Sequence, residues 1–503
     1  MKSKEKIKYN LVLGVLSEIL TIVLGILVPR LILTSYGSEI NGLLNSVTQI
    51  YSYIALLEAG IGTATVQALY KAIAAASNDQ KNSILAATNK YYHKTGILYF
   101  VAIIVFSVIY PLAVDTDIPI ITIVLVIIFN GLGSVINYFF QAKYFLLLQA
   151  EGKNYIKTSL TMFTNIFKNV MKILLMYFGF DVVFVQAIAM LVSLIQMVYI
   201  IWYIKKYYKW IDLNVKPDFE SISQSKNVLV HQISGLVFSN TDNIVLTVFC
   251  GLKAVSVYSM YNLFFSMINT AQVTVSGSIV FLLGQTYHTD KKKFMKLYDI
   301  YEVYYMALTF MLYSVTLYFI LPFMKIFTSG VTDVEYLDKW LPYLFTFSSL
   351  LSCARNAPNN AISFAGHFKQ TQNRSILEAI INLTVSLVCV NYFGIYGVLF
   401  GTIVALLYRT NDIIVYASKN VLKRTPLITY KRWAVDLFIF AVVQYINRFV
   451  CLDMDSYVKI IAYAIPYTIV SFVIYFGIAS LFDLKVSKDA IYLLIGMIRR
   501  KKA

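Results

Sequence analysis

The sequence predicts an all-α integral membrane protein with 14 transmembrane helices, arranged as two parallel six-helix lobes around a central cavity plus two extra C-terminal helices. Three observations lead to this prediction: the composition, the distribution of positive charge and an internal repeat. Of the 503 residues, 58% are hydrophobic and only 14% are charged, with a mean hydropathy of +0.67. A soluble domain is about 25% charged. Since a spanning helix needs about 20 apolar residues, 14 spans would use nearly all the apolar residues and leave no sizeable soluble domain.

Each predicted span is a run of apolar residues bounded by polar residues. We expect the spans at about 10–35, 42–70, 96–114, 118–142, 157–178, 182–204, 227–250, 255–287, 298–321, 340–363, 374–391, 395–416, 433–450 and 458–481.

The net charge of +17 does not point to nucleic acid, because its distribution follows the predicted topology. If the connections alternate between the two sides, starting with a cytoplasmic N-terminus, about 33 Lys and Arg lie in cytoplasmic segments and only about five on the opposite side. The positive-inside rule therefore predicts that both termini are cytoplasmic. No nucleic-acid partner is expected.

An internal repeat with an offset of about 215 residues supports the two-lobe arrangement. The segments Tyr177-Phe178-Gly179-Phe180 and Tyr392-Phe393-Gly394-Ile395 match, Ala150-Glu151-Gly152 parallels Ala365-Gly366, and Gly37 corresponds to Gly251. Six helices separate the copies, and an even number preserves their orientation in the membrane, so the repeat is parallel. We therefore expect an N-terminal lobe (1–204), a cytoplasmic linker (205–226), a C-terminal lobe (227–416), two further helices (417–481) and a cytoplasmic amphipathic basic tail (482–503) that contacts anionic lipids.

Five basic residues lie inside predicted spans: Arg30, Lys168, Lys172, Arg355 and Arg409. A cation in the bilayer costs several kcal/mol unless it faces water, a partner or an anionic ligand, so such residues mark a pathway by default. The fifth span carries a polar stripe at helical spacing, made of Thr161, Asn165, Lys168, Asn169 and Lys172. We interpret this stripe as the binding face for an anionic ligand; the alternative is that the lysines pair with acids on neighbouring helices.

Two arginines have similar alternatives. Arg30 follows Pro29, which can kink a helix, and it either binds the ligand or extends toward the outer headgroups. Arg355 begins a polar, proline-broken stretch that ends at Asn360, and such stretches occur where they line a cavity or are buried in protein. Near the cytoplasmic ends, Arg374 with Glu378 and Arg409 with Asp412 are expected to form intrahelical ion pairs.

Three residues are candidates for coupling transport to an ion: Asp242 with its neighbour Asn243, and Glu58 in a glycine-broken part of the second span. Asp242 fits a structural pair with an arginine equally well. The sequence contains no metal-ligand spacing and no nucleotide-binding loop, so we expect no cofactor and no metal. The energy for transport is expected to come from counterflow of protons or sodium ions through Asp242 or Glu58, or from the membrane potential, and the sequence does not decide between them.

A catalytic alternative rests on two acidic pairs in loops, Asp115 with Asp117 and Asp453 with Asp455, which resemble the acids of polyprenyl-dependent glycosyltransferases or polymerases. Those enzymes usually have a large external domain, for which this chain has no room. Polar turns explain both pairs, and we expect that the chain is not an enzyme.

The predicted architecture and two segments, Gly235 to Leu246 and Phe393 to Thr402, resemble the bacterial oligosaccharide flippase (Wzx-like polysaccharide exporter) family. This family belongs to the superfamily that also contains multidrug extruders and the lipid II flippase. The resemblance implies translocation of an undecaprenyl-pyrophosphate-linked oligosaccharide across the bacterial cytoplasmic membrane for surface polysaccharide synthesis, with glycosyltransferases and a polymerase as partners. It also implies a cationic central cavity, to which Arg30, Lys168, Lys172 and Arg355 would contribute. A multidrug extruder is the alternative, although it would be expected to have an acidic cavity.

Overall fold

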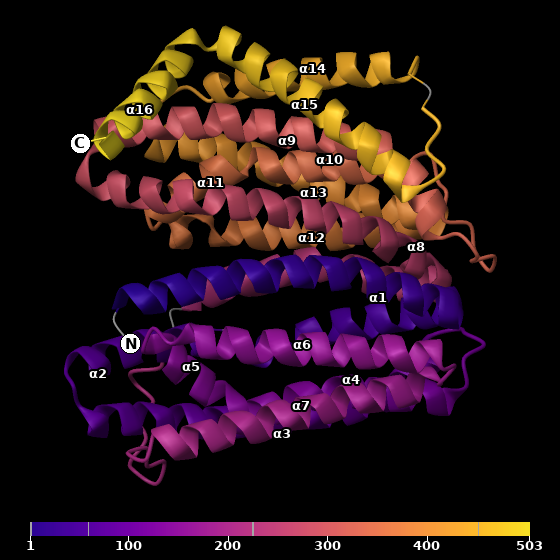
Figure 1. Cartoon of the computed structure of the whole chain (residues 1–503), viewed down its shortest axis with the longest axis vertical. Helices are drawn as coiled ribbons and strands as arrows, with labels where there is room; N and C mark the ends of the chain where they lie inside the picture. Colours follow the sequence, from indigo (N-terminus) through magenta and orange to yellow (C-terminus); the bar gives the residue numbers. More distant parts are fainter. Residues whose placement is uncertain (1–2, 59, 224–225, 451, 503) are drawn as a thin grey trace. The chain divides into compact units, whose positions relative to one another are not determined.

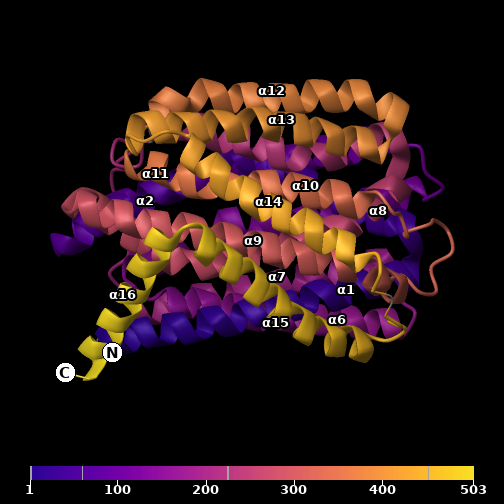
Figure 2. The same ribbon diagram turned by 90° about the horizontal axis from the view of Figure 1, so that it is seen from above.

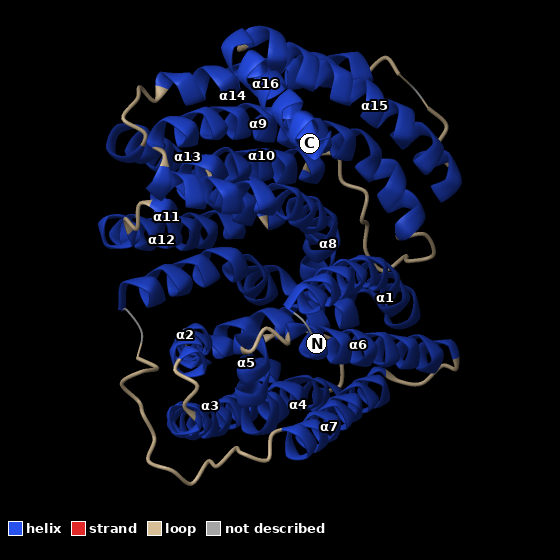
Figure 3. Cartoon of the chain, turned by 60° about the vertical axis from the view of Figure 1, so that its left-hand side comes forward, coloured by secondary structure: helices blue, strands red, loops and turns tan. Residues whose placement is uncertain are grey.

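The computed structural model describes residues 3–58, 60–223, 226–450 and 452–502, and within these residues it contains helices and no strand (Figure 3). In the N-terminal half the elements are α1 (Ser3–Ile54), the 3-10 turn η1 (Ala55–Glu58), α2 (Ile61–Ala74), α3 (Asn78–Ala113), α4 (Ile120–Ile136), the π-helical turn η2 (Asn137–Gln141), α5 (Ala142–Ala150), α6 (Asn154–Tyr177) and α7 (Val182–Tyr207). They are followed by α8 (Lys226–Thr289), α9 (Lys291–Phe327), α10 (Leu341–Ala354), α11 (Asn356–Phe364), α12 (Phe368–Phe393), α13 (Ile395–Tyr416), the π-helical turn η3 (Ala417–Val421), α14 (Leu427–Asn447), α15 (Tyr457–Phe482) and α16 (Leu484–Lys502). The predicted all-α fold is confirmed.

In the described part of the chain, nine helical segments are long and apolar enough to cross a membrane. Two of them, in α1 and α8, contain a glycine with non-helical backbone angles, Gly37 and Gly251, at which each helix is interrupted. The chain is therefore a multi-pass membrane protein. The total of 14 crossings and the sides on which the termini lie stay predictions.

The backbone supports the internal repeat at the glycines that the sequence paired. Gly37 and Gly251 have φ of 83° and 79°, Gly152 and Gly366 have 69° and 70°, and Gly179 and Gly394 have 76° and 54°. Residues other than glycine rarely adopt backbone angles in this left-handed region. Each match in the sequence therefore marks a pair of equivalent turns, where one helix ends and the next begins.

The helices pack into two compact units, of which the first comprises Met1–Val257 and Gly330–Val334. In this unit α1 packs on α6, α4 packs on both α3 and α7, and α6 packs on α7 (Figure 1). The unit extends beyond the predicted N-terminal lobe because it includes the first part of α8. The predicted lobe boundaries at 204 and 227 stay predictions.

The predicted linker (205–226) is packed against the first unit over most of its described length. Asn82 near the start of α3 donates to the carbonyl oxygen of Trp210 and accepts from the amide of Asp212, each at 3.2 Å. Ile222 is buried in the same apolar cluster as α2 and α5. The segment is therefore part of the packed unit up to Ile222.

The second unit comprises Tyr258–Ser329 and Glu335–Ala503. Its closest helix pair is α12 with α13 (Figure 2). A Cβ atom at Gly397 would lie 2.3 Å from the carbonyl oxygen of Cys389, and one at Gly401 would lie 2.2 Å from Ser386 Oγ. The two glycines, four residues apart on one face of α13, thus allow the close approach of the two helices.

Ion pairs hold α14 to α9 and α15 in the second unit. Arg424 and Arg432 both pair with Asp299 and Glu302 of α9, and Arg432 also pairs with Asp483, which ends α15. Glu302 is fully buried. The helix α16 that follows corresponds to the predicted basic tail (482–503), and the side chains of Leu494 and Arg499 lie outside those described.

Candidate functional site

The polar stripe predicted on the fifth span lies on α6, in the first unit. One face of this helix carries exposed apolar side chains, namely those of Phe163, Phe167, Val170 and Leu174. Because an α-helix has 3.6 residues per turn, the polar stripe from Thr161 to Lys172 lies on the opposite face. Exposed apolar side chains on one face are typical of the surface that contacts lipid. The two lysines therefore project from the face opposite to the lipid-facing one.

Neither lysine is neutralised by an acid in the described part of the chain. Lys172 Nζ lies 3.4 Å from Oε1 of Gln186, a buried amide on α7. Lys168 makes no hydrogen bond or ion pair with the described residues, and no carboxylate lies within 4 Å of either ammonium group. Both side chains are half-buried. The alternative that the two lysines pair with acids on neighbouring helices therefore finds no support among the described residues.

Arg30 lies on α1, the helix that packs along α6. Leu31, Ile32 and Tyr36 contact the cluster that contains Leu175 and Met176 near the end of α6. Arg30 itself is half-buried. The helix continues through Pro29 and is interrupted at Gly37 instead. Arg30 is therefore held in the same unit as the two lysines, on a helix that adjoins theirs.

Arg355, the fourth predicted substrate-binding cation, belongs to the second unit and has a carboxylate partner. It separates α10 from α11, as the proline-broken sequence predicted, and its guanidinium pairs with Glu378 of α12. The same carboxylate lies 3.4 Å from Arg409 Nε. A buried carboxylate between two arginines stabilises the packing of the helices that carry them. Arg355 therefore has a structural role that does not require binding of substrate.

Of the two intrahelical ion pairs expected from the sequence, one is confirmed. Arg409 pairs with Asp412 at 2.6 Å, as predicted. The expected pair of Arg374 with Glu378 is wrong, because Arg374 pairs with Asp412 of α13 instead. Since α12 and α13 lie so close, ion pairs across the two helices replace the pair along one helix.

Glu58 ends the 3-10 turn between α1 and α2 and lies among tyrosines. The hydroxyl of Tyr92 donates to Glu58 Oε1 at 2.7 Å, and the Tyr92 ring stacks on that of Tyr138 with 5.9 Å between the centroids. Within the described residues no lysine or arginine pairs with Glu58. Glu58 is therefore held by a hydrogen bond from a tyrosine hydroxyl and by no ion pair within the described residues.

Asp242 and Asn243 are both buried in the first part of α8. The preceding residue, Thr241, shares a hydrogen bond of 2.7 Å with the hydroxyl of Tyr53. The Asn243 Oδ1 atom is buried and has no hydrogen-bond partner among the residues that the structure describes. These two candidates lie in the same unit as Glu58. Among the described residues, no group of three or more His, Cys, Asp or Glu side chains could hold a metal ion.

Two buried cations among the described residues, Lys143 and the Arg432 of the ion-pair cluster described above, were missed by the sequence reasoning. Lys143 of α5 donates to Asn89 Oδ1 at 2.7 Å and to the carbonyl oxygen of Phe139 at 3.1 Å, and it is buried. It is the second residue after the π-helical turn η2, a rare feature that is frequent at functional sites. A lysine in an otherwise apolar stretch was the available signal.

The acidic pairs of the catalytic alternative lie in exposed segments. Asp453 and Asp455 both pair with Lys459, at 2.9 and 2.8 Å. The hydrogen bond from Lys459 holds the pKa of the Asp455 carboxyl below its usual value. In the other loop, Thr116, between Asp115 and Asp117, donates to Glu39 at 2.7 Å.

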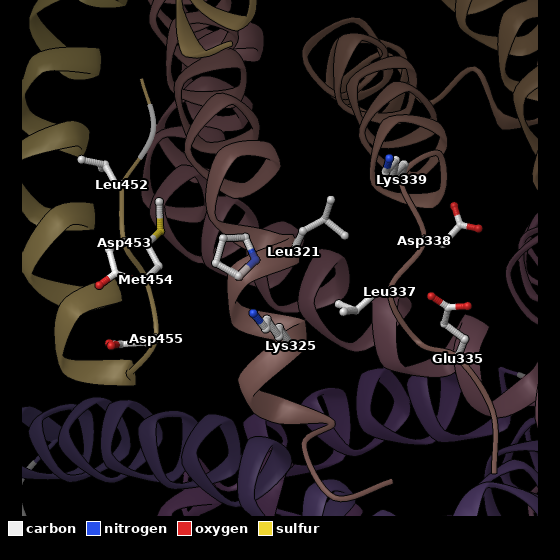
Figure 4. A pocket seen from close by; sticks show the side chains of 11 residues that line it. Leu321, Lys325, Glu335, Leu337, Asp338, Lys339, Leu452, Asp453, Met454 and Asp455 are labelled. Carbon is white, nitrogen blue, oxygen red and sulfur yellow. The ribbon is translucent and has the colours of Figure 1, made fainter. Parts of the chain in front are cut away.

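The segment around Asp453 lines a pocket of about 550 Å³ in the second unit (Figure 4). In this view Lys325, near the end of α9, lies between the Asp453–Asp455 segment and the segment that carries Glu335 and Asp338. The walls combine acidic and basic side chains with Leu321 and Pro322. The pocket is thus a polar surface hollow of mixed charge, unlike the cationic face of α6.

A groove of a different character lies between α14 and α15. It has a volume of about 660 Å³, and its walls are apolar, with Phe438, Val442 and Ile446 from α14 and Ile474 and Ile478 from α15. Such a groove can hold an apolar chain.

Comparison with known proteins supports the fold. No protein-family model and no curated protein matches the sequence. Among solved structures, the lipid II flippase MurJ in an inward closed conformation matches with a TM-score of 0.69 and 14% identity, over 95% of this chain and 99% of that one.

Two MATE transporters match as well. An inward-facing MATE family transporter of the MOP superfamily has a TM-score of 0.60 and 15% identity, over 79% of this chain and 95% of that one. A mutant of the Vibrio cholerae MATE transporter VcmN has a TM-score of 0.55 and 16% identity, over 84% and 98% of the two chains. The chain therefore has the fold that is shared by MATE transporters of the MOP superfamily and the lipid II flippase MurJ.

Proposed function

We propose that this protein is a flippase that moves undecaprenyl-pyrophosphate-linked oligosaccharide repeat units from the inner to the outer leaflet of the bacterial cytoplasmic membrane. The product would enter surface polysaccharide synthesis, of the capsular, exopolysaccharide or O-antigen type. The observation that carries the proposal is the cationic face of α6, where Lys168 and Lys172 lie opposite the lipid-facing stripe and pair with no carboxylate of the described residues.

The charge of this face matches a pyrophosphate headgroup. A pyrophosphate cannot cross hydrocarbon unaided, and ammonium groups in a site of low dielectric constant replace its water with charge-assisted hydrogen bonds. Two lysines one helical turn apart repel each other, so an anionic ligand between them would relieve the repulsion. Arg30, on the adjoining helix, and the amides of Asn165 and Asn169 are the further groups that we assign to the substrate.

Other parts of the molecule agree with a lipid-linked cargo. The likeness to MurJ, a lipid II flippase, extends over nearly all of both chains. The apolar groove between α14 and α15 would suit a prenyl chain. We propose that the two repeats alternate between inward-open and outward-open arrangements, and that protonation of Glu58, or a cation held near Asp242 and Asn243, couples the change to an ion gradient.

The test compares three variants in proteoliposomes that contain a fluorescent lipid-linked oligosaccharide. Lys168→Gln combined with Lys172→Gln should abolish translocation while the protein still inserts and unfolds at a similar temperature. Lys168→Arg combined with Lys172→Arg should retain part of it, because the charge remains. Lys157→Gln, a change in the first turn of the same helix, is the matched control and should behave like the wild type.

Two results would contradict the proposal. Normal translocation by the double glutamine variant would exclude the cationic face as the binding site. Active efflux of organic cations by the wild-type protein, with no movement of the lipid-linked oligosaccharide, would instead favour the multidrug extruder.

A further inference from the structure

Asp436 is a buried carboxylic acid that the proposed transport mechanism does not use. It lies in the middle of α14, and its side chain is only 3% exposed. Within the described part of the chain it makes no hydrogen bond or ion pair, and its Oδ1 atom is buried without a partner. An ionised carboxylate in this position would be unpaired, and burial of an unpaired charge costs several kcal/mol.

The nearest cation cannot neutralise Asp436 because it is already occupied. Arg432 lies one turn earlier on the same helix. Its Nε and Nη2 atoms donate to Asp483, and its Nη1 atom donates to both Asp299 and Glu302. All three guanidinium nitrogens thus face acids on α9 and at the end of α15.

The charge balance of this cluster points in the same direction. Arg424 and Arg432 supply two positive charges, whereas Asp299, Glu302 and Asp483 supply three negative ones. Another ionised carboxylate would increase the excess of negative charge in this cluster. The remaining titratable neighbour, Tyr475 of α15, shares a hydrogen bond with Ser314 at 3.0 Å and carries no charge that could help.

A small cavity next to Asp436 provides room for proton exchange but not for a metal ion. It measures about 10 Å³ and is lined by Asp436, Arg432, Asp483, Val303, Ala479 and Phe482. This volume holds about one water molecule. A sodium ion would need several oxygen ligands and would lie beside the guanidinium of Arg432. Asp483, whose side chain is 25% exposed, reaches solvent.

We propose that Asp436 is a proton-binding site: in the folded protein at neutral pH it is a neutral carboxylic acid, and it exchanges its proton through the small cavity that Arg432 and Asp483 line. The site lies in the second unit, apart from Glu58, Asp242 and Asn243. The proposal is independent of the cargo and goes beyond the proposed flippase activity.

Infrared spectroscopy of the purified full-length protein tests this proposal. The wild type should show the C=O stretching band of a protonated carboxyl group, which shifts in D2O and disappears as the pH is raised well above neutral. Asp436→Asn, which keeps the shape and the neutral charge, should lose this band and keep the melting temperature when it is compared with its parent in a Glu58→Gln background, since that change removes the other carboxyl group that we propose to bind a proton. Glu302→Gln is the matched control: its carboxylate is ionised between two arginines, so this change should leave the band in place.

A second measurement needs no variant. An apolar carbodiimide reacts with protonated carboxyl groups in apolar surroundings, so in the wild type it should modify Asp436 and spare Glu302, as read by peptide mass spectrometry. A band that persists in Asp436→Asn in the Glu58→Gln background, or modification of Glu302 without Asp436, would overturn the assignment.

Discussion

Asn41 and Ser256 are joined by a hydrogen bond of 2.6 Å between Asn41 Nδ2 and Ser256 Oγ, and they lie 215 residues apart in the chain. This separation is the offset of the internal repeat. Each residue lies about one helical turn after the glycine that interrupts its helix, Gly37 or Gly251. The two copies of the repeat therefore meet at nearly equivalent positions, where the contact is polar and close, and Ser46 with Thr247 extends it at 2.8 Å.

The close approach at this contact depends on Gly42. A Cβ atom there would lie 2.0 Å from the carbonyl oxygen of Leu252, a backbone atom that cannot rotate away. Gly42→Ala should therefore force the helices apart, destabilise the protein by about 1–3 kcal/mol and reduce transport. The measurement is the melting temperature of the purified protein, together with translocation in proteoliposomes.

Gly235→Ala is the control for this prediction. Apart from its own stretch of helix, no atom of the described residues lies within 4 Å of the Cβ position at Gly235, and alanine favours the helix. This variant should be as stable as the wild type or slightly more stable. Equal melting temperatures for Gly42→Ala and Gly235→Ala would show that the contact at Gly42 is looser than the structure indicates.

The helices and the repeat were predictable because the signals are local. Apolar runs of membrane length form helices wherever they occur, and each repeated glycine marks a turn that only the left-handed region permits. The break at Arg355 was predictable for the same reason, since Pro358 cannot continue the hydrogen bonding of the preceding turn.

The partners of the charged residues were not predictable. Glu378 and Arg374 are four residues apart, and the sequence alone favours their pairing. In the folded protein Gly397 and Gly401 bring α13 so close to α12 that Asp412 binds Arg374, while Glu378 binds Arg355 and Arg409. Lys143 was missed because it lies near the end of its span, where a lysine reads as a residue of the next loop.

The position of Glu378 between Arg355 and Arg409 yields a second prediction. Glu378→Gln would leave the buried guanidinium of Arg409 and the half-buried one of Arg355 with less negative charge. Breaking a buried ion pair by removing one partner costs about 3–5 kcal/mol. The melting temperature should therefore fall clearly. The double variant Glu378→Gln with Arg355→Gln should regain part of the lost stability. It removes one of the two guanidinium groups that lose Glu378 as a partner, and Arg409 keeps its ion pair with Asp412.

The single variant Arg355→Gln distinguishes a structural Arg355 from a substrate-binding one. A structural role predicts that Arg355→Gln lowers stability and that transport falls in proportion. If Arg355→Gln kept the wild-type melting temperature and lost translocation, the original prediction of a substrate-binding arginine would be favoured instead.

A third prediction concerns Glu58 and its tyrosine partner. Glu58→Gln removes the group that can bind a proton but keeps an acceptor for the Tyr92 hydroxyl, so the protein should fold normally. Transport that a proton gradient drives should fall strongly and lose its dependence on pH. Tyr92→Phe is the matched change, since it removes the hydrogen bond, at a cost of about 1 kcal/mol, and leaves the carboxyl group in place. Coupling through Glu58 would be excluded if Glu58→Gln showed the same pH profile as the wild type.

The contact between Asp333 and Ser38 predicts a loss of stability in acid. The Asp333 carboxylate accepts from the Ser38 amide at 2.8 Å and from its hydroxyl at 2.6 Å, and so caps the helix where it restarts after Gly37. Partial burial raises the pKa of Asp333, but the hydrogen bonds from Ser38 and the nearby Lys253 outweigh it and leave the pKa below its usual value.

A carboxyl group whose pKa is lowered in the folded state stabilises the protein above its unfolded pKa of about 3.9, and this contribution is lost as the pH falls through the folded value. The melting temperature of the wild type should therefore decrease more steeply toward acid than that of Asp333→Asn, and the two curves should converge at low pH. Asp117→Asn, a change of an exposed aspartate in the loop before α4, should follow the wild type throughout. Parallel curves for the wild type and Asp333→Asn would show that the cap contributes nothing to stability, because only a bond made to the ionised carboxylate can produce the difference in slope.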